Sequence, residues 1–222
     1  MKCRPILMSA PMVRALLDGR KTQTRRVLKT QPVFDPERCH WTHDSKIAVS
    51  RWTGPKPQAC ALYGLVNFEC PYGVPGDRLL AKETWAFWDG GEHSRRDGGG
   101  VTFRADCLDT SGQERGDNLR ARLDFGVKWR PSIFMPRWVS RITLEITDVR
   151  VERLQDISEA DAIAEGVEYL PDVGGWRCYM NERGGYTYAV TSYRSLWESI
   201  NGPGSWAANP WVWVIGYRRV TT

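Results

Sequence analysis

The sequence predicts an α+β protein: a small β-barrel with a few flanking helices and long loop insertions. Apolar residues mostly alternate with polar ones in short runs, which is the spacing of strands, and helical spacing is confined to a few short segments. A first strand over residues 2–9 and a last strand over residues 211–217 could pair and so close the sheet. The last strand is apolar on both faces, which is typical of a central strand.

A single domain is expected, because 222 residues are enough for one sizeable core with room for insertions. We place the insertions at about 30–69, 87–130 and 168–188, where turn-forming and polar residues prevail and no clear period is present. A short hairpin with strands near residues 47–52 and 61–70 is the only regular structure predicted in the first of them.

Charge and hydropathy restrict the partners. The net charge of +5 permits an anionic partner such as a nucleotide, RNA or single-stranded DNA, but it is too small to require one. No apolar run approaches the length of a membrane span, and the first residues lack the long apolar run of a signal peptide. We therefore expect a cytoplasmic protein with no membrane partner, either a monomer or a small homo-oligomer.

Three helices are predicted. The first begins near residue 10 and ends at Gly19, since glycine is favoured directly after a helix. The second covers residues 159–165, with Ser158 as its N-cap and Gly166 directly after its end. The third covers residues 191–200 and buries Leu196 and Trp197.

Two further strands carry clear alternation. Residues 78–85 form one strand, which follows a segment dense in proline and glycine. Residues 140–154 form the longest one, with a bend expected near Asp148.

The segment at residues 20–26 holds four cations and two threonines directly after the first helix. One interpretation is a solvated basic turn. The alternative is catalytic: neighbouring cations lower the pKa of Lys21, so that its neutral form could act as a general base. Thr24 would then be the nucleophile. Because Lys21 and Thr24 point to opposite faces of a flat strand, they converge only if this segment bends.

Glu165 is the second candidate for chemistry. It lies in the last turn of a short helix, where the helix dipole is negative and a carboxylate is unfavourable. A carboxyl group that keeps its proton near neutral pH is a proton donor. The alternative is an exposed surface glutamate.

Other candidates remain open between structural and functional roles. Glu83 is either a partner of Arg25 or Arg26 or a solvent-facing residue. The tryptophans Trp85, Trp88, Trp211 and Trp213 either form a stacking pocket or pack in the core, and core packing is favoured. Six scattered cysteines are expected to be free thiols. A zinc site could be built from Cys39, His40, His43, Cys60 and Cys70, but the spacing matches no common pattern, so no metal or cofactor is predicted.

Several motifs together resemble a known family. Residues 19–26 (GRKTQTRR) look like the GxKTxTxR motif of the ASCH family, a branch of the PUA-like β-barrels. Residues 70–73, 76–79 and 82–85 resemble the segment that follows in larger, phage-encoded members. The helix at residues 156–166 and the tryptophan-rich last strand also fit. The resemblance covers about half of the chain.

This resemblance implies an activity. Small bacterial members are amidohydrolases that remove the acyl group from N4-acetylcytidine and related N4-acylated cytosines, with a threonine nucleophile, a lysine base and a glutamate proton donor. These roles fall on Thr24, Lys21 and Glu165, without a metal. The substrate-binding residues expected around them are Thr22, Arg25, Arg26, Glu83 and Trp85. Here Gln23 and Arg25 replace residues that are often apolar in the family.

A binding module is the competing hypothesis. Other ASCH and PUA-like proteins bind RNA, and nuclease activity has been proposed for some. The basic segment would then hold a nucleic-acid backbone while aromatic side chains stack on unpaired bases.

Overall fold

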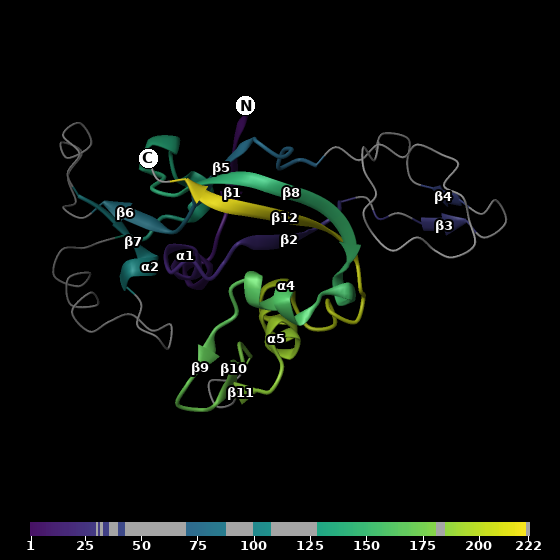
Figure 1. The fold of residues 1–222 in the computed structure, drawn as a ribbon. Coiled ribbons are helices and arrows are strands. Elements are labelled where there is room, and N and C mark those ends of the chain that lie inside the picture. Colours follow the sequence, from purple (N-terminus) through teal and green to yellow (C-terminus); the bar gives the residue numbers. More distant parts are fainter. Residues whose placement is uncertain are drawn as a thin grey trace.

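The computed structural model describes residues 1–29, 31, 33–35, 40–42, 70–87, 100–107, 128–180 and 185–220. These residues form an α+β structure, as predicted. Its centre is a five-stranded sheet in the order β1-β5-β8-β12-β2, with helices α4 and α5 beneath the β2 and β12 side (Figure 1). The predicted hairpin strands near residues 47–52 and 61–70 lie outside the described residues, except for Cys70.

The strands of this sheet are β1 (Cys3–Leu7), β2 (Gln23–Val27), β5 (Arg78–Lys82), β8 (Thr143–Arg153) and β12 (Trp211–Val220). β1 runs parallel to β5, and every other neighbouring pair is antiparallel. β12 is central, between β8 and β2, as its apolar character predicted. Its residues Val212, Val214 and Ile215 are fully buried.

The predicted pairing of the first and last strands is wrong. β1 pairs with β5, whereas β12 pairs with β8 and β2, and the structure shows no closed barrel among the residues it describes. Sequence pattern fixes which residues of a strand face the core but not which strand lies beside it. β1 and β2 are therefore the two edges of an open sheet.

The helices follow the predicted capping residues. α1 (Ala10–Leu17) is followed by Gly19 with φ of 75°. α4 (Glu159–Ala164) begins after Ser158, whose hydroxyl accepts a hydrogen bond from the Asp161 N–H, and is followed by Gly166 with φ of 87°. α5 (Ala189–Asn201) is slightly longer than predicted, and α2 (Arg104–Cys107) was not predicted.

The long strand β8 bends where expected. Opposite Asp148, the β8–β12 register shifts between Gly216 and Tyr217, which is a β-bulge. The other predicted long strand is interrupted: β5 ends at Lys82, and β6 (Trp85–Phe87) pairs instead with β7 (Val101–Phe103). The break at Glu83 turns Trp85 out of the main sheet and into a second, smaller core with Met135 and Val139.

Three expected insertions contain regular structure where the chain is described. β3 (Val33–Asp35) and β4 (His40–Thr42) form a hairpin in the first. β7 and α2 lie in the second. In the third, β9 (Tyr169–Leu170), β10 (Gly175–Arg177) and β11 (Gly185–Tyr186) form a small antiparallel sheet near α5. Short 3₁₀ turns η2 (Ser132–Phe134), η3 (Arg137–Val139) and η4 (Leu154–Asp156) complete the described elements.

Candidate functional site

Lys21 and Glu165 form a buried ion pair between the start of β2 and the end of α4. The Lys21 ammonium Nζ donates to the Glu165 carboxylate Oε2 at 2.9 Å and to the Glu165 backbone oxygen at 2.7 Å. Only 4% of Lys21 and 3% of Glu165 is exposed. Two sequence candidates 144 positions apart are thus in direct contact.

The backbone around this pair fixes its position. The Lys21 N–H donates to the Ala15 carbonyl of α1 at 3.0 Å, and the Thr22 N–H donates to the Ala164 carbonyl of α4 at 2.8 Å. Gly166 provides the space for the lysine stem. A Cβ built on Gly166 would lie 2.8 Å from the Lys21 Cβ and 2.9 Å from the Ala15 Cβ. Glycine is therefore required there for its left-handed φ and for this close approach.

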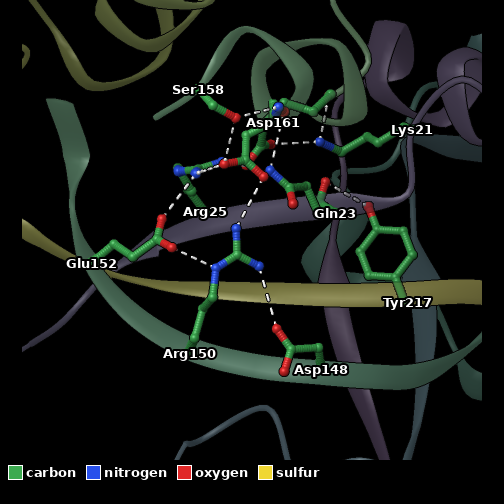
Figure 2. Close-up of polar contacts among 10 residues, drawn as sticks. Lys21, Gln23, Arg25, Asp148, Arg150, Glu152, Ser158, Asp161 and Tyr217 are labelled. Atoms are coloured by element: carbon green, nitrogen blue, oxygen red, sulfur yellow. Dashed lines mark hydrogen bonds and ion pairs between the residues drawn. The ribbon is translucent and has the colours of Figure 1, made fainter. Parts of the chain in front are cut away.

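Arg25 connects three carboxylates of two other elements. Its guanidinium, with a side chain 0% exposed, lies 3.3 Å from Glu165 Oε1, 3.1 Å from Glu152 Oε2 and 3.4 Å from Asp161 Oδ2. Arg150 of β8 donates to Asp161 Oδ1 at 3.0 Å and also binds Glu152. Figure 2 shows these side chains of β2, β8 and α4 converging in one charged network.

Gln23 extends the network along the same face of β2. Its side-chain amide donates to the Asp161 carbonyl at 3.0 Å, and its own carbonyl accepts from the Tyr217 hydroxyl at 3.1 Å (Figure 2). The Ser158 hydroxyl donates to Asp161 Oδ2 at 3.0 Å. The Tyr217 hydrogen bond uses the Gln23 backbone carbonyl, so the contacts that require polar side chains on β2 are those of the Gln23 amide and the Arg25 guanidinium.

Burial sets the protonation chemistry of Lys21. Desolvation lowers the pKa of Lys21 below its usual 10.5, while Glu165 opposes this shift and the charges of Arg26 and Arg25 add to it. The predicted direction is confirmed. Its main cause is burial, and the neighbouring cations contribute less than the sequence argument assumed. Partial burial raises the pKa of Asp161, but Arg25, Ser158 and Arg150 outweigh it and lower that pKa.

Thr24 and Arg26 lie on the other face of β2. In the strand register Thr24 pairs with Ile215 and Arg25 with Val214, so Thr24 and Arg25 point to opposite faces. Thr24 is 5% exposed, and its hydroxyl makes no hydrogen bond within the described residues. Lys21, Arg25 and Glu165 are therefore brought together, whereas Thr24 is not hydrogen-bonded to this group.

Arg26 reaches across to the opposite edge of the sheet. Its guanidinium donates to the Leu7 carbonyl of β1 at 2.6 Å and lies 3.9 Å from the Met8 sulfur. Thr22 is exposed at the entry to β2. Both residues are on the surface side of the candidate site.

Glu83 is neither a partner of Arg25 or Arg26 nor a solvent-facing residue, so both alternatives are wrong. It is 1% exposed and accepts two hydrogen bonds from Arg141, at 2.9 and 3.1 Å. Burial raises the pKa of Glu83, and Arg141 opposes this shift. Glu83 faces Arg141 because the chain turns between β5 and β6, a break that alternation did not predict.

Trp85 is a core residue. It is 1% exposed, its ring packs edge-on against Phe87 at 4.9 Å, and the Arg130 guanidinium lies 5.4 Å from its centre. Trp211 and Trp213 are buried in the main core, so core packing is confirmed for these three tryptophans. Trp88 and most of the suggested zinc ligands lie outside the described residues, and Cys70 is a free thiol.

A pocket of about 110 Å³ opens beside Gly166. It is lined by Pro11, Arg14, Asp18, Arg20, Gly166, Glu168 and Tyr179. Arg20 donates to the Gly166 carbonyl at 3.2 Å, so the pocket adjoins the backbone that carries Glu165. Lys21 and Glu165 do not line it.

Sequence reasoning missed Asp161, Arg150 and Glu152. A signal was present: Asp161 lies four residues before Glu165 in one helix, and Arg150 and Glu152 share a face of β8. These spacings place the charges on common faces but do not indicate that the faces meet.

Comparisons with protein-family models, with curated proteins and with solved structures find no match to this chain. In the described part of the chain, no helix is both long enough and apolar enough to cross a membrane.

Proposed function

We propose that this protein is an amidohydrolase that removes acyl groups from N4-acylated cytosine nucleosides or nucleotides. The observation that supports this best is the buried contact between Lys21 and Glu165. The sequence predicts these two residues as base and acid, and their side chains are in contact. A lysine whose pKa is lowered by burial is suited to act as a general base at neutral pH.

The fold proposed with this function is a PUA-like barrel that remains open between β1 and β2. The Arg26 side chain spans these edges through its hydrogen bond to the Leu7 carbonyl. This contact holds the edges near each other without strand pairing. The arrangement is compatible with the family resemblance, which rests on sequence motifs.

The proposed reaction proceeds through an acyl-threonine. Neutral Lys21 takes the proton of the Thr24 hydroxyl as the Thr24 oxygen bonds to the acyl carbonyl carbon. Lys21 becomes neutral by passing the one proton of the resting ion pair to Glu165 along their 2.9 Å contact, and Glu165 delivers this proton to N4 as the carbon–nitrogen bond breaks. Water then hydrolyses the ester and regenerates Thr24. The first step requires Lys21 Nζ to reach the Thr24 hydroxyl, so substrate binding must displace one of its contacts with Glu165.

The arginines have different roles in this proposal. Arg25 is a positioning residue, because its buried guanidinium is used in holding Glu165, Asp161 and Glu152. Arg26 lies on the same face as Thr24 and is partly exposed, so it is the cation available to stabilise a developing oxyanion.

The test is release of cytidine from N4-acetylcytidine, and of deoxycytidine from its deoxy form, by the purified protein. We expect Thr24→Ala to lower kcat/KM at least about 1000-fold because it removes the nucleophile. Glu165→Gln should lower it about 100-fold or more because it removes the proton donor. Thr187→Ala, which alters an exposed threonine before α5, is the matched control and should retain full activity.

Thermal unfolding of each variant separates loss of chemistry from loss of folding. Absence of cytidine release by the folded wild-type protein would refute the proposed activity for these substrates. Full activity in a folded Thr24→Ala variant would refute the proposed nucleophile.

A further inference from the structure

The chain between β7 and β8 presents large apolar side chains to solvent. Ile133 is 60% exposed, Phe134 71% and Trp138 62%. They lie on the 3₁₀ turns η2 and η3, which are anchored from beneath by the buried Met135 and Val139. The turns are therefore held in place while their aromatic side chains are free of the core.

The same surface is positively charged. Residues 128–144 contain Lys128, Arg130, Arg137 and Arg141 but no acidic residue. Arg141 is neutralised by Glu83 and Asp106. The other three have no acidic partner within the described residues.

Two cations flank the exposed side chains directly. Lys82 donates to the Ile133 carbonyl at 3.4 Å, and Arg137 donates to the Cys3 carbonyl at 3.3 Å. Neither forms an ion pair with a described residue. Together, Lys82, Ile133, Phe134, Arg137 and Trp138 are called here the basic aromatic surface.

This surface is connected to the proposed catalytic segment. Lys82 at one side contacts Ile133, and its carbonyl accepts from the Met8 N–H at 2.9 Å. Arg26 contacts the Met8 sulfur and the Leu7 carbonyl. The end of β1 thus lies between the basic aromatic surface and Arg26.

We propose that the basic aromatic surface binds single-stranded nucleic acid. Phe134 and Trp138 stack on unpaired bases, and Lys82 and Arg137 contact phosphates, since such binding combines aromatic platforms with unpaired cations. This proposal rests on the proposed function in one respect. The bound nucleic acid extends from the basic aromatic surface toward Arg26 and Thr24, so the acylated cytosine is one nucleotide of that polynucleotide. That location favours nucleic acid over an anionic lipid surface, which would offer the same charge but no cytosine.

The test uses fluorescence anisotropy of a labelled, unmodified oligocytidylate of about 12 nucleotides, as RNA and as DNA, with the full chain. We expect Phe134→Ala and Trp138→Ala each to weaken binding about tenfold through lost stacking. Lys82→Ala and Arg137→Ala should each reduce the slope of log K against log salt by about 0.7, the value for one phosphate of a single strand.

Two matched controls lie on or beside α5. Tyr188 is an aromatic residue that is 63% exposed, and Arg194 has a side chain that is 54% exposed. Tyr188→Ala and Arg194→Ala should leave both affinity and salt slope unchanged. Equal weakening by Tyr188→Ala and Trp138→Ala would overturn the proposal, because it would show no preference for this surface. Binding of the wild-type protein to phosphatidylserine vesicles but not to oligocytidylate would also overturn it.

The unmodified oligonucleotide cannot be deacylated, so this test is independent of catalysis. Lack of N4-acetylcytidine hydrolysis, combined with oligonucleotide binding that Trp138→Ala weakens, would refute the proposed reaction and support the surface. Hydrolysis of N4-acetylcytidine by a protein that does not bind the oligonucleotide would support the reaction and overturn the surface.

Discussion

The charges at the centre of the candidate site are arranged so that no carboxylate serves one cation alone. Glu165 binds Lys21 through Oε2 and Arg25 through Oε1, and Arg25 also binds Glu152 and Asp161. Removal of a charge from a buried pair is costly because its partner remains desolvated. The cost therefore depends on how many partners each residue leaves behind.

This arrangement predicts an asymmetry between two substitutions. Glu165→Gln leaves both Lys21 and Arg25 without that carboxylate and should lower the free energy of unfolding by about 4 kcal/mol. Lys21→Met should cost less, about 2 kcal/mol, because Glu165 retains Arg25. Urea denaturation measures both. Equal losses would show that the Arg25 contact contributes little to Glu165.

The lowered pKa of Lys21 predicts a pH dependence of stability. Burial places this pKa below 10.5, so between the two values the unfolded chain binds more protons than the folded chain. The free energy of unfolding contributed by Lys21 should therefore rise with pH through this window and fall as the pH is lowered. The difference between wild type and Lys21→Met, measured by urea denaturation at several pH values, should have that sign. A difference that falls with rising pH would contradict it.

At the scale of elements, the site depends on how the end of α4 meets the start of β2. Gly166 makes this possible because it has both a positive φ and no side chain between Lys21 and Ala15. The two effects can be separated, since Gly19 after α1 has a similar φ of 75°, but nothing lies within 4 Å of a Cβ built on it.

Gly166→Ala should therefore be more destabilising than Gly19→Ala. In both variants the alanine must adopt a left-handed backbone conformation, which costs about 1 kcal/mol. In Gly166→Ala the added methyl group also displaces Lys21 from its position, which we expect to lower the free energy of unfolding by about 2 kcal/mol more. The free energies of unfolding of the two variants measure the difference. Equal free energies of unfolding for the two variants would mean that the close contact between Lys21 and Gly166 does not matter for stability.

Local sequence correctly predicted many of the helix ends and strands. Gly19, Ser158 and Gly166 mark helix ends through backbone geometry that requires only adjacent residues. The alternation of apolar and polar residues predicted β8, and the bend expected near Asp148 is present. The partner of Glu83 was not predictable, because Arg141 lies 58 positions away and meets it only through the turn between β5 and β6. Lys21 and Glu165 could be selected singly, but their contact depends on how α4 docks on β2.

At the scale of the whole molecule, the main sheet has two edges that one side chain connects. Arg26 of β2 donates to the Leu7 carbonyl at the end of β1. Strand patterns in the sequence suggested a closed barrel, but they carry no information on neighbour order, which the long-range pairing of β1 with β5 determines. The expected pairing was between the first and the last strand, whereas an arginine contact joins β1 to β2 in the structure.

Loss of this contact should loosen β1. We expect Arg26→Met to increase amide hydrogen exchange in β1 and to lower the free energy of unfolding by about 1 kcal/mol, the value of a partly exposed charged hydrogen bond. Arg137→Met is the matched control, since Arg137 donates to Cys3 at the other end of the same strand. Its effect should be confined to that end. Unchanged exchange near Leu7 in Arg26→Met would show that β1 is held by β5 alone.

The position of β12 has a consequence for the order in which the molecule is made. β2, which carries Thr24 and Arg25, has β12 as its sheet neighbour, and β12 comes at the far end of the described chain. During synthesis, the basic segment leaves the ribosome well before its strand partner β12 does. A nascent chain that stops before residue 211 contains Lys21, Thr24 and Glu165 but lacks the strand that pairs with β2, which carries Thr24. The site is thus complete only once β12 has been made, when Lys21, Thr24 and Glu165 already exist.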